Sequence, residues 1–166
     1  MTDQAKYQAY KRSGALEKVV HAVEKLIRNE NEFVVDEKWW RHYLSFRPRD
    51  WVDNSLTGII GFVFNSTPGS LRIQLMIYQC EYEGGPNVDT LREAWLKYAI
   101  ANPPVFKPSG PRLNKTNNTI YSYKVLGSYS PNITAMEIDE QLRLNWKDFF
   151  YSDYPKLKEA IRLFKG

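Results

Sequence analysis

One stretch near the middle of the chain alternates between two kinds of side chain more regularly than any other part of the sequence. The odd positions are apolar and the even positions are mostly polar: Leu71, Ile73, Leu75 and Ile77 against Arg72, Gln74, Met76 and Tyr78. Because successive side chains of a strand point to opposite faces of a sheet, this period of two predicts a strand that is buried on one face. The chain must therefore fold around a sheet, with other elements covering at least one of its sides.

The segments beside this strand predict the rest of the sheet. Residues 56–65 are rich in Ile, Phe and Val, and a turn signal, residues 65–70, joins them to the alternating stretch. This order predicts an antiparallel hairpin. Gly58 and Gly61 indicate a bulge or a close neighbour in its first strand. Residues 33–47 are predicted as one strand that completes a three-stranded meander, and residues 119–126 as a fourth strand.

Helical patterns flank the predicted strands. Apolar residues recur at intervals of three and four between residues 5 and 29, where Gly14 could break the helix. Thr90 and Glu93 have the spacing of a capping box for a helix that ends near residue 101. Thr134 offers the same signal for a helix up to residue 151, and Asp153 can cap the last one. The fold class is therefore α+β, with an N-terminal, a middle and two C-terminal helices around the sheet.

Length and composition place the chain among ordinary globular proteins. Its 166 residues fit a single domain, residues 1–166, that needs no disulfide or metal to remain folded. The one cysteine, Cys80, cannot form an internal disulfide. No signal peptide and no apolar run of membrane-spanning length is present, so we expect a cytoplasmic protein without a membrane partner.

Positive charge is concentrated in one segment of the chain. The net charge is +4, yet no acidic residue lies between Glu93 and Glu137. The five basic residues of that window are Lys97, Lys107, Arg112, Lys115 and Lys124. Part of the window, residues 103–118, is a long connection rich in proline and asparagine, and such connections often carry function. The segment is either a solvated loop or a surface for phosphates or acidic partners.

Cations and aromatic rings alternate between residues 38 and 51. In a strand, Trp39, Arg41, Tyr43 and Arg47 would share one face, and Arg49 and Trp51 follow directly. This mixture suits stacking on bases and contact with phosphates, and also the centres of protein interfaces. The alternative is a strand whose aromatic face is buried while arginine stems cover the other. The candidate binding residues are Trp39, Arg41, Tyr43, Arg47, Arg49, Trp51, Lys107, Arg112 and Lys115.

Motifs for catalysis or for cofactors do not emerge from the sequence. The two histidines, His21 and His42, lie on different predicted elements, and no Cys-x-x-Cys or glycine-rich phosphate loop occurs. The carboxylates at positions 50, 53, 81 and 83 could hold Mg²⁺ for phosphodiester cleavage, or could simply face water. We therefore expect no cofactor.

The predicted order of elements, helix, three antiparallel strands, helix and strand, resembles the core of the restriction-endonuclease-like PD-(D/E)xK superfamily. In that family an aspartate opens the second strand, where Asp53 is the nearest match, and Glu-x-Lys lies on the third. This chain has Gln74-Leu75-Met76 at the latter place. The resemblance therefore implies a relative that has lost catalysis.

Three functions are compatible with these features. The first is a non-enzymatic binding module for a protein or a nucleic acid, acting through the cationic-aromatic strand face and the basic segment. The second is a metal-dependent nuclease or phosphodiesterase that uses Asp53, Glu81 or Glu83 with Lys38 or Arg41. The third is a structural or inhibitory subunit of a phage or defence assembly.

Overall fold

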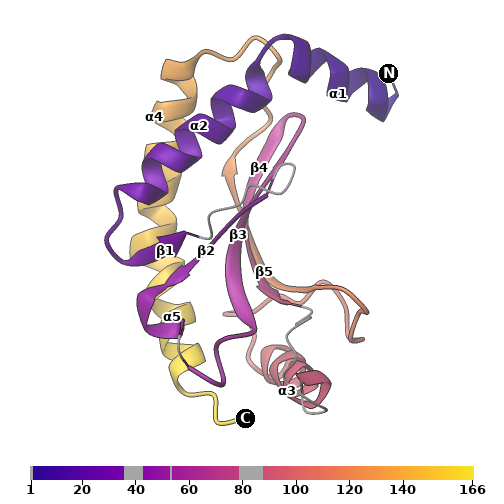
Figure 1. Cartoon of the computed structure of the whole chain (residues 1–166), viewed down its shortest axis with the longest axis vertical. Helices are drawn as coiled ribbons and strands as arrows, with labels where there is room; N and C mark the ends of the chain where they lie inside the picture. The colour runs from indigo at the N-terminus through magenta and orange to yellow at the C-terminus, as the bar shows by residue number, and fades with distance from the viewer. Residues whose placement is uncertain (1, 36–42, 53, 79–87) are drawn as a thin grey trace.

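The computed structural model describes residues 2–35, 43–52, 54–78 and 88–166 (Figure 1). Its helices are α1 (Asp3–Arg12), α2 (Ala15–Arg28), α3 (Val88–Ala101), α4 (Ala135–Asp148) and α5 (Tyr154–Arg162). Its strands are β1 (Phe33–Val35), β2 (Tyr43–Pro48), β3 (Ile60–Thr67), β4 (Ser70–Ile77) and β5 (Asn118–Leu126). Two short turns complete the order: the 3₁₀ turn η1 (Arg49–Trp51) and the π-helical turn η2 (Phe149–Asp153).

The strands form one antiparallel sheet in the order β1-β2-β3-β4-β5. This confirms the α+β class, but the described residues form a sheet of five strands instead of four. The difference arises in residues 33–47, which were expected to form one strand. Phe33 pairs with Pro48 and Val35 with Phe46, so β1 and β2 run in opposite directions. Strand-favouring residues lie on both sides of Asp36, Glu37 and Lys38, and no glycine or proline within the segment marks the end of one strand and the start of the next.

The hairpin of β3 and β4 forms as its pattern predicts. Thr67 pairs with Ser70 across the turn, where Gly69 has a positive φ of 85°. Gly61 lies so close to the Tyr78 ring that a Cβ there would come within 2.8 Å of its Cε2 atom. The expected close neighbour of Gly61 is therefore confirmed. The strand itself starts at Ile60, four residues later than expected. The residues before it form a turn, in which Gly58 N donates to the Asn54 carbonyl at 2.9 Å.

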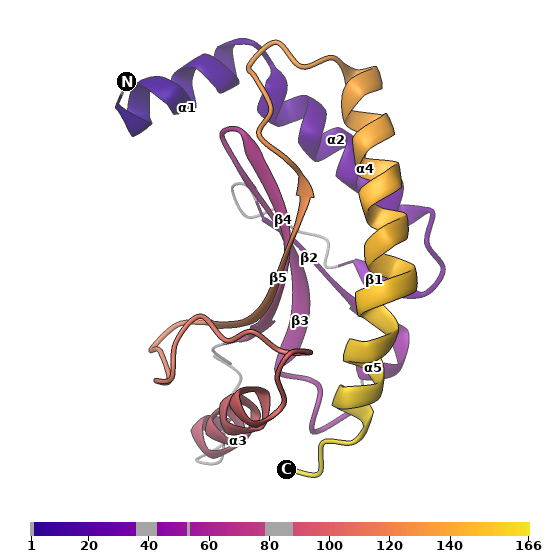
Figure 2. The ribbon, with the colours of Figure 1, turned by 180° about the vertical axis from the view of Figure 1, so that it is seen from behind.

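Helices α2, α4 and α5 cover one face of the sheet, and the two opposite views agree on this arrangement (Figures 1 and 2). Phe46 and Phe62 stack with ring centroids 5.4 Å apart, and Phe46 and Phe64 at 4.9 Å. Trp146 of α4 and Phe149 of η2 meet these rings from the helical side. Most aromatic side chains of the described residues are therefore buried.

Helix boundaries follow some of the predicted signals and depart from others. Gly14, with φ of 77°, separates α1 from α2, and the capping box of Thr134 and Glu137 is present. The capping box expected at Thr90 is wrong, because α3 already begins at Val88. Asp153 does not cap α5 either. The helix continues through η2, and the Asp153 carboxylate accepts a hydrogen bond from the Tyr121 hydroxyl at 2.7 Å.

A second, smaller apolar cluster holds α3 beside the C-terminal segment. The buried Trp95 ring stacks on Phe164 with centroids 3.6 Å apart, and its Nε1 donates to the Leu56 carbonyl at 2.8 Å. Helix α3 is thereby fixed at one end of the sheet, while α1 lies at the other end (Figure 2). Among the described residues, no helix is long and apolar enough to cross a membrane.

Candidate binding surface

The side of the sheet opposite α2, α4 and α5 carries mostly polar side chains, and we call it the open face. No described helix lies over its centre (Figures 1 and 2). Strand pairing aligns these side chains in rows. One row reads Tyr43, Asn65, Arg72 and Lys124, from β2 to β5. The next row reads Ser45, Val63, Gln74 and Ser122. With strands about 4.8 Å apart, the first row spans about 14 Å.

The open face is cationic. Arg47, Arg72 and Lys124 are the only charged residues within the five strands, and strand alternation places all three on this face. No aspartate or glutamate occurs in any of the described strands. Since opposite charges are not interspersed here, the three cations act together on an approaching anion.

Hydrogen bonds fix several side chains of the open face in place. The Arg72 Nη1 atom donates to the Ser122 hydroxyl at 3.3 Å, and the Asn65 amide donates to the Gln74 side chain at 3.0 Å. Arg47 donates from Nη1 to the Gly58 carbonyl at 3.4 Å. Tyr43 is 36% exposed, and Lys124 is exposed as well. The face thus offers one exposed ring and, two and three strands away in the same row, the cations Arg72 and Lys124.

The predicted cationic-aromatic cluster is only partly brought together. Tyr43 and Arg47 lie on the open face as expected, whereas Trp39 and Arg41 lie outside the described residues. The prediction that Trp51 belongs to the binding surface is wrong. The strand ends at Pro48, and η1 turns the Trp51 ring into the core, where it stacks on Phe62 at 5.6 Å. Arg49 remains exposed in η1 and donates from Nε to the Asn31 carbonyl at 2.6 Å.

The basic loop, residues 102–117, lies beside the first residues of β5. Its main chain runs along that strand, because Lys107 N donates to the Ile120 carbonyl at 2.8 Å and Ser109 N to the Thr119 carbonyl at 2.9 Å. The side chains of Lys107, Arg112 and Lys115 are exposed. The prediction of a long exposed connection is therefore confirmed, and the loop lies at the same end of the sheet as α3 (Figure 2).

A buried arginine, which the sequence reasoning missed, holds the far part of this loop. Arg92 of α3 is 3% exposed, and its Nη2 atom donates to the Asn114 carbonyl at 2.9 Å and the Thr116 carbonyl at 2.6 Å. The buried Asn118 donates to the Arg112 carbonyl at 3.0 Å. One signal was available. Arg92 stands three residues before Trp95, on the stripe of α3 that faces the core.

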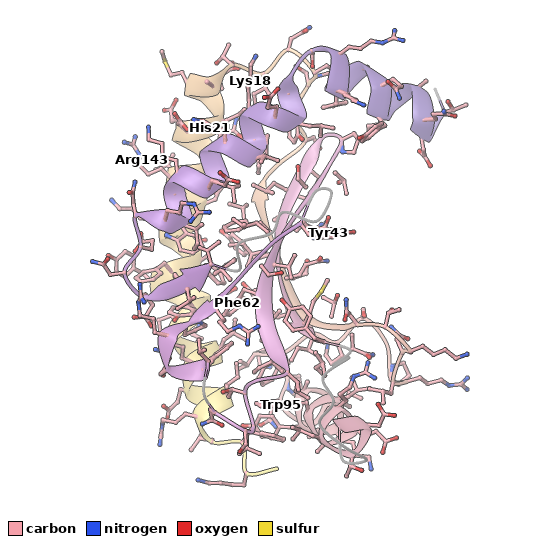
Figure 3. All side chains as sticks on the ribbon, in the orientation of Figure 1. Lys18, His21, Tyr43, Phe62, Trp95 and Arg143 are labelled. Atoms are coloured by element: carbon pink, nitrogen blue, oxygen red, sulfur yellow. The ribbon has the colours of Figure 1, made fainter. Side chains whose placement is uncertain are left out.

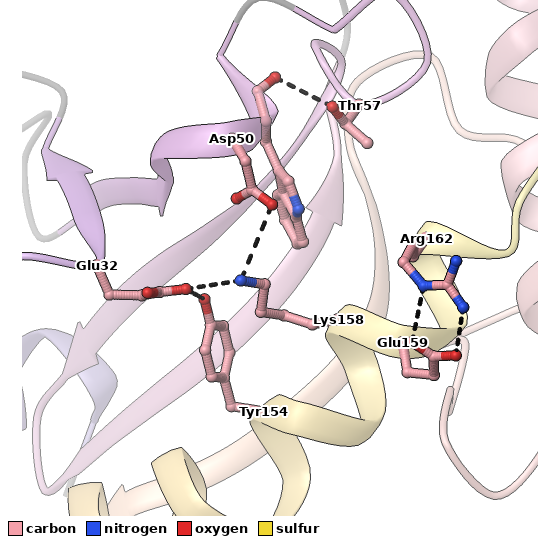
Figure 4. A network of polar contacts seen from close by, with 8 residues as sticks. Glu32, Asp50, Thr57, Tyr154, Lys158, Glu159 and Arg162 are labelled. Carbon is pink, nitrogen blue, oxygen red and sulfur yellow. Dashed lines mark hydrogen bonds and ion pairs between the residues drawn. The ribbon is translucent and has the colours of Figure 1, made fainter.

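The described carboxylates near the candidate metal site are engaged in a structural network (Figure 4). Glu32 accepts hydrogen bonds from Lys158 at 2.7 Å and from the Tyr154 hydroxyl at 2.8 Å, and Asp50 lies 3.9 Å from the Lys158 ammonium. The hydrogen bond from Lys158 lowers the pKa of Glu32. Burial and the bond to Glu32 raise the pKa of Tyr154. These contacts tie the start of β1 and η1 to α5.

A metal site is not formed by the residues that the structure describes. No group of three histidine, cysteine, aspartate or glutamate residues suitable for a metal occurs among them. Asp53, Glu81 and Glu83 lie outside the described residues, as do Lys38 and His42, and His21 is an exposed residue of α2. The nuclease hypothesis and the restriction-endonuclease-like resemblance therefore stay predictions.

No similarity to a known protein indicates the function, so the function is inferred from the open face and the basic loop. The chain matches no protein-family model, no curated protein and no solved structure.

Proposed function

We propose that the protein is a non-enzymatic module that binds nucleic acid through the open face and the basic loop. The observation that carries this proposal is the sorting of charge on the sheet. Three cations and no carboxylate occupy the described strands, and all three cations are on the side that the helices leave uncovered. A phosphate backbone is the polyanion that such a surface fits, since its affinity comes from many simple charge contacts.

The exposed side chains favour a nucleic acid over a protein partner. Protein interfaces concentrate their binding energy in a desolvated centre that is enriched in aromatic residues. Of the large hydrophobic side chains that the structure describes as exposed, Tyr43 alone lies on the open face. In its row Tyr43 lies two strands from Arg72 and three from Lys124, about 10 and 14 Å away. The ring therefore suits the stacking of one base, with the cations placed for phosphates further along the strand. We therefore favour single strands over duplexes.

The basic loop extends the cationic surface beyond the edge of the sheet. Arg92 and Asn118 hold its backbone from below, so the exposed Arg112 and Lys115 project from an anchored segment. A loop that is ordered before binding loses less conformational entropy when it contacts a ligand. The open face and the loop each contribute three cations that can contact phosphates, six in all: Arg47, Arg72, Lys124, Lys107, Arg112 and Lys115.

Fluorescence anisotropy with short single-stranded and double-stranded DNA and RNA, at several salt concentrations, tests the proposal. We expect single strands to bind more tightly, with an affinity that falls linearly in a plot of log K against log salt. Six phosphate contacts correspond to a slope of about −4 on a single strand. Gels of the same samples with Mg²⁺ should show intact nucleic acid. Absence of binding at low salt would refute the proposal, and cleavage would favour the nuclease.

A further inference from the structure

A groove runs between α2 and α4 on the side of the molecule away from the open face. Its main part has a volume of about 650 Å³, and a neighbouring part adds about 370 Å³. The two parts share Ala22, Lys25 and Asp139, so they form one continuous surface, which we call the α2–α4 groove. It lies where two helices of 14 residues each run next to each other.

The floor of the α2–α4 groove is apolar, and large apolar side chains extend beyond it. Ala22 and the almost fully buried Leu142 lie in the groove with Leu26. Met136 at its edge is 78% exposed, and Leu144, two turns further along α4, is 59% exposed. Met136 thus adds exposed apolar surface at the edge of the groove.

The two rims of the groove carry opposite charge. On α2, Lys18, His21 and Lys25 recur at intervals of three and four and form one stripe; Figure 3 shows the first two projecting away from the sheet. Glu17 is the acidic residue on this rim. On α4, Asp139 and Glu140 line the groove, and Arg143 follows one turn later.

The decisive feature of the rims is that their described charges form no ion pair across the groove. Among the ion pairs of the described residues, none joins Lys18 or Lys25 to Asp139 or Glu140 within 4.0 Å. The basic rim, with Lys18 and Lys25, and the acidic rim, with Asp139 and Glu140, therefore face the same space with no ion pair between these described residues. An occupant with an acidic edge opposite α2 and a basic edge opposite α4 would satisfy both.

We propose that the α2–α4 groove is the dimer interface of this protein, occupied by the same groove of a second copy. A twofold axis along the groove places α2 of each subunit over α4 of the other. The basic rim then meets the acidic rim twice, and the apolar floors face each other. Such an isologous contact needs only one surface that is complementary to itself.

The size of the groove sets the strength of the contact. A helix of 14 residues is about 21 Å long and about 10 Å wide, so two of them form a patch of about 20 by 20 Å. This is smaller than the roughly 800 Å² that each partner of a stable complex usually buries. We therefore expect a weak dimer, as is typical of such small interfaces. Its two open faces point away from the contact, and each remains free for a ligand.

Sedimentation equilibrium of the full chain, without nucleic acid, tests this interface separately from the proposed function. We expect the average mass to rise towards twice the chain mass over the micromolar range. Lys25→Glu and Asp139→Lys should each weaken the dimer about tenfold, because each sets like charges against one another. The double variant Lys25→Glu/Asp139→Lys should restore it, since the rims are then complementary again. Lys156→Glu on α5 makes the same charge change outside the groove and should leave the dimer unchanged.

Circular dichroism keeps these outcomes distinct from misfolding, because a folded single variant retains the spectrum and melting temperature of the parent. A parent chain that is monomeric at every concentration overturns the interface. Folded single variants that dimerise normally also overturn it, as does a double variant that stays as weak as the singles. None of these results bears on nucleic-acid binding, which is measured with a different ligand on the opposite side of the sheet.

Discussion

The two faces of the same sheet differ in what they contact. The covered face consists of stacked rings and aliphatic side chains against α2, α4 and α5, with Phe46, Phe62 and Leu75 fully or almost fully buried. The alternate residues of the same strands form the open face, which carries mostly hydroxyls, amides and cations, with the buried Val63 among them. The covered face thus completes itself within the chain, whereas the open face has no element of the described chain over its centre. We accordingly assign stability to one set of alternate residues and propose binding for the other set.

Leu75 and Gln74 test this division most sharply, because they are neighbours on opposite faces of β4. Leu75→Ala should lower the free energy of unfolding by about 2–5 kcal/mol, as it leaves a cavity in the core. Gln74→Ala should cost about 1 kcal/mol, the value of its hydrogen bond from Asn65. Urea denaturation measures both. Equal losses would mean that the open face is packed as closely as the covered one.

Arg92 tests whether the basic loop is anchored. Arg92→Met keeps an apolar stem but leaves the Asn114 and Thr116 carbonyls without their donor, at a cost of about 1–3 kcal/mol. Amide hydrogen exchange should become faster across residues 112–118, and affinity for single strands should fall. Lys97→Met on the exposed side of α3 is the control. Unchanged exchange in the Arg92 variant would show that the loop is held by other contacts.

Glu32 gives a smaller effect, with a defined dependence on pH. Its pKa in the folded protein is lowered, mainly by Lys158, so its contribution to stability is present above the unfolded pKa of about 4.3 and is lost as pH falls through the folded value. Because the Glu32 side chain is 36% exposed, the contribution is at most about 1 kcal/mol. Thermal melts of Glu32→Gln and the parent should differ at neutral pH and converge in acid. A difference that grows in acid would contradict this assignment.

The sequence predicts the covered face better than the open one, for a physical reason. Strict alternation in residues 71–77 and the capping box at Thr134 are local signals, and both are present in the structure. The position of Trp51 depends on where β2 ends, which η1 decides by turning the ring towards Phe62. The helical spacing of Arg92 from Trp95 can indicate that Arg92 is buried, but not that it bonds carbonyls 22 and 24 positions away. Tyr43 and Arg47 were identified because they follow the simple alternation of a strand.

Binding by charge-matched variants tests the central claim, that the open face binds nucleic acid. Arg72→Gln/Lys124→Gln removes two cations from the open face, and Lys147→Gln/Lys156→Gln removes two exposed cations from the helical side. Both variants have the same net charge, and both should retain most of the stability of the parent. With a short single strand, we expect the first to bind more weakly, with a salt slope shallower by about 1–2, and the second to bind like the parent. Equal losses from the two variants, or a loss confined to the helical-side variant, would contradict the assignment of binding to the open face.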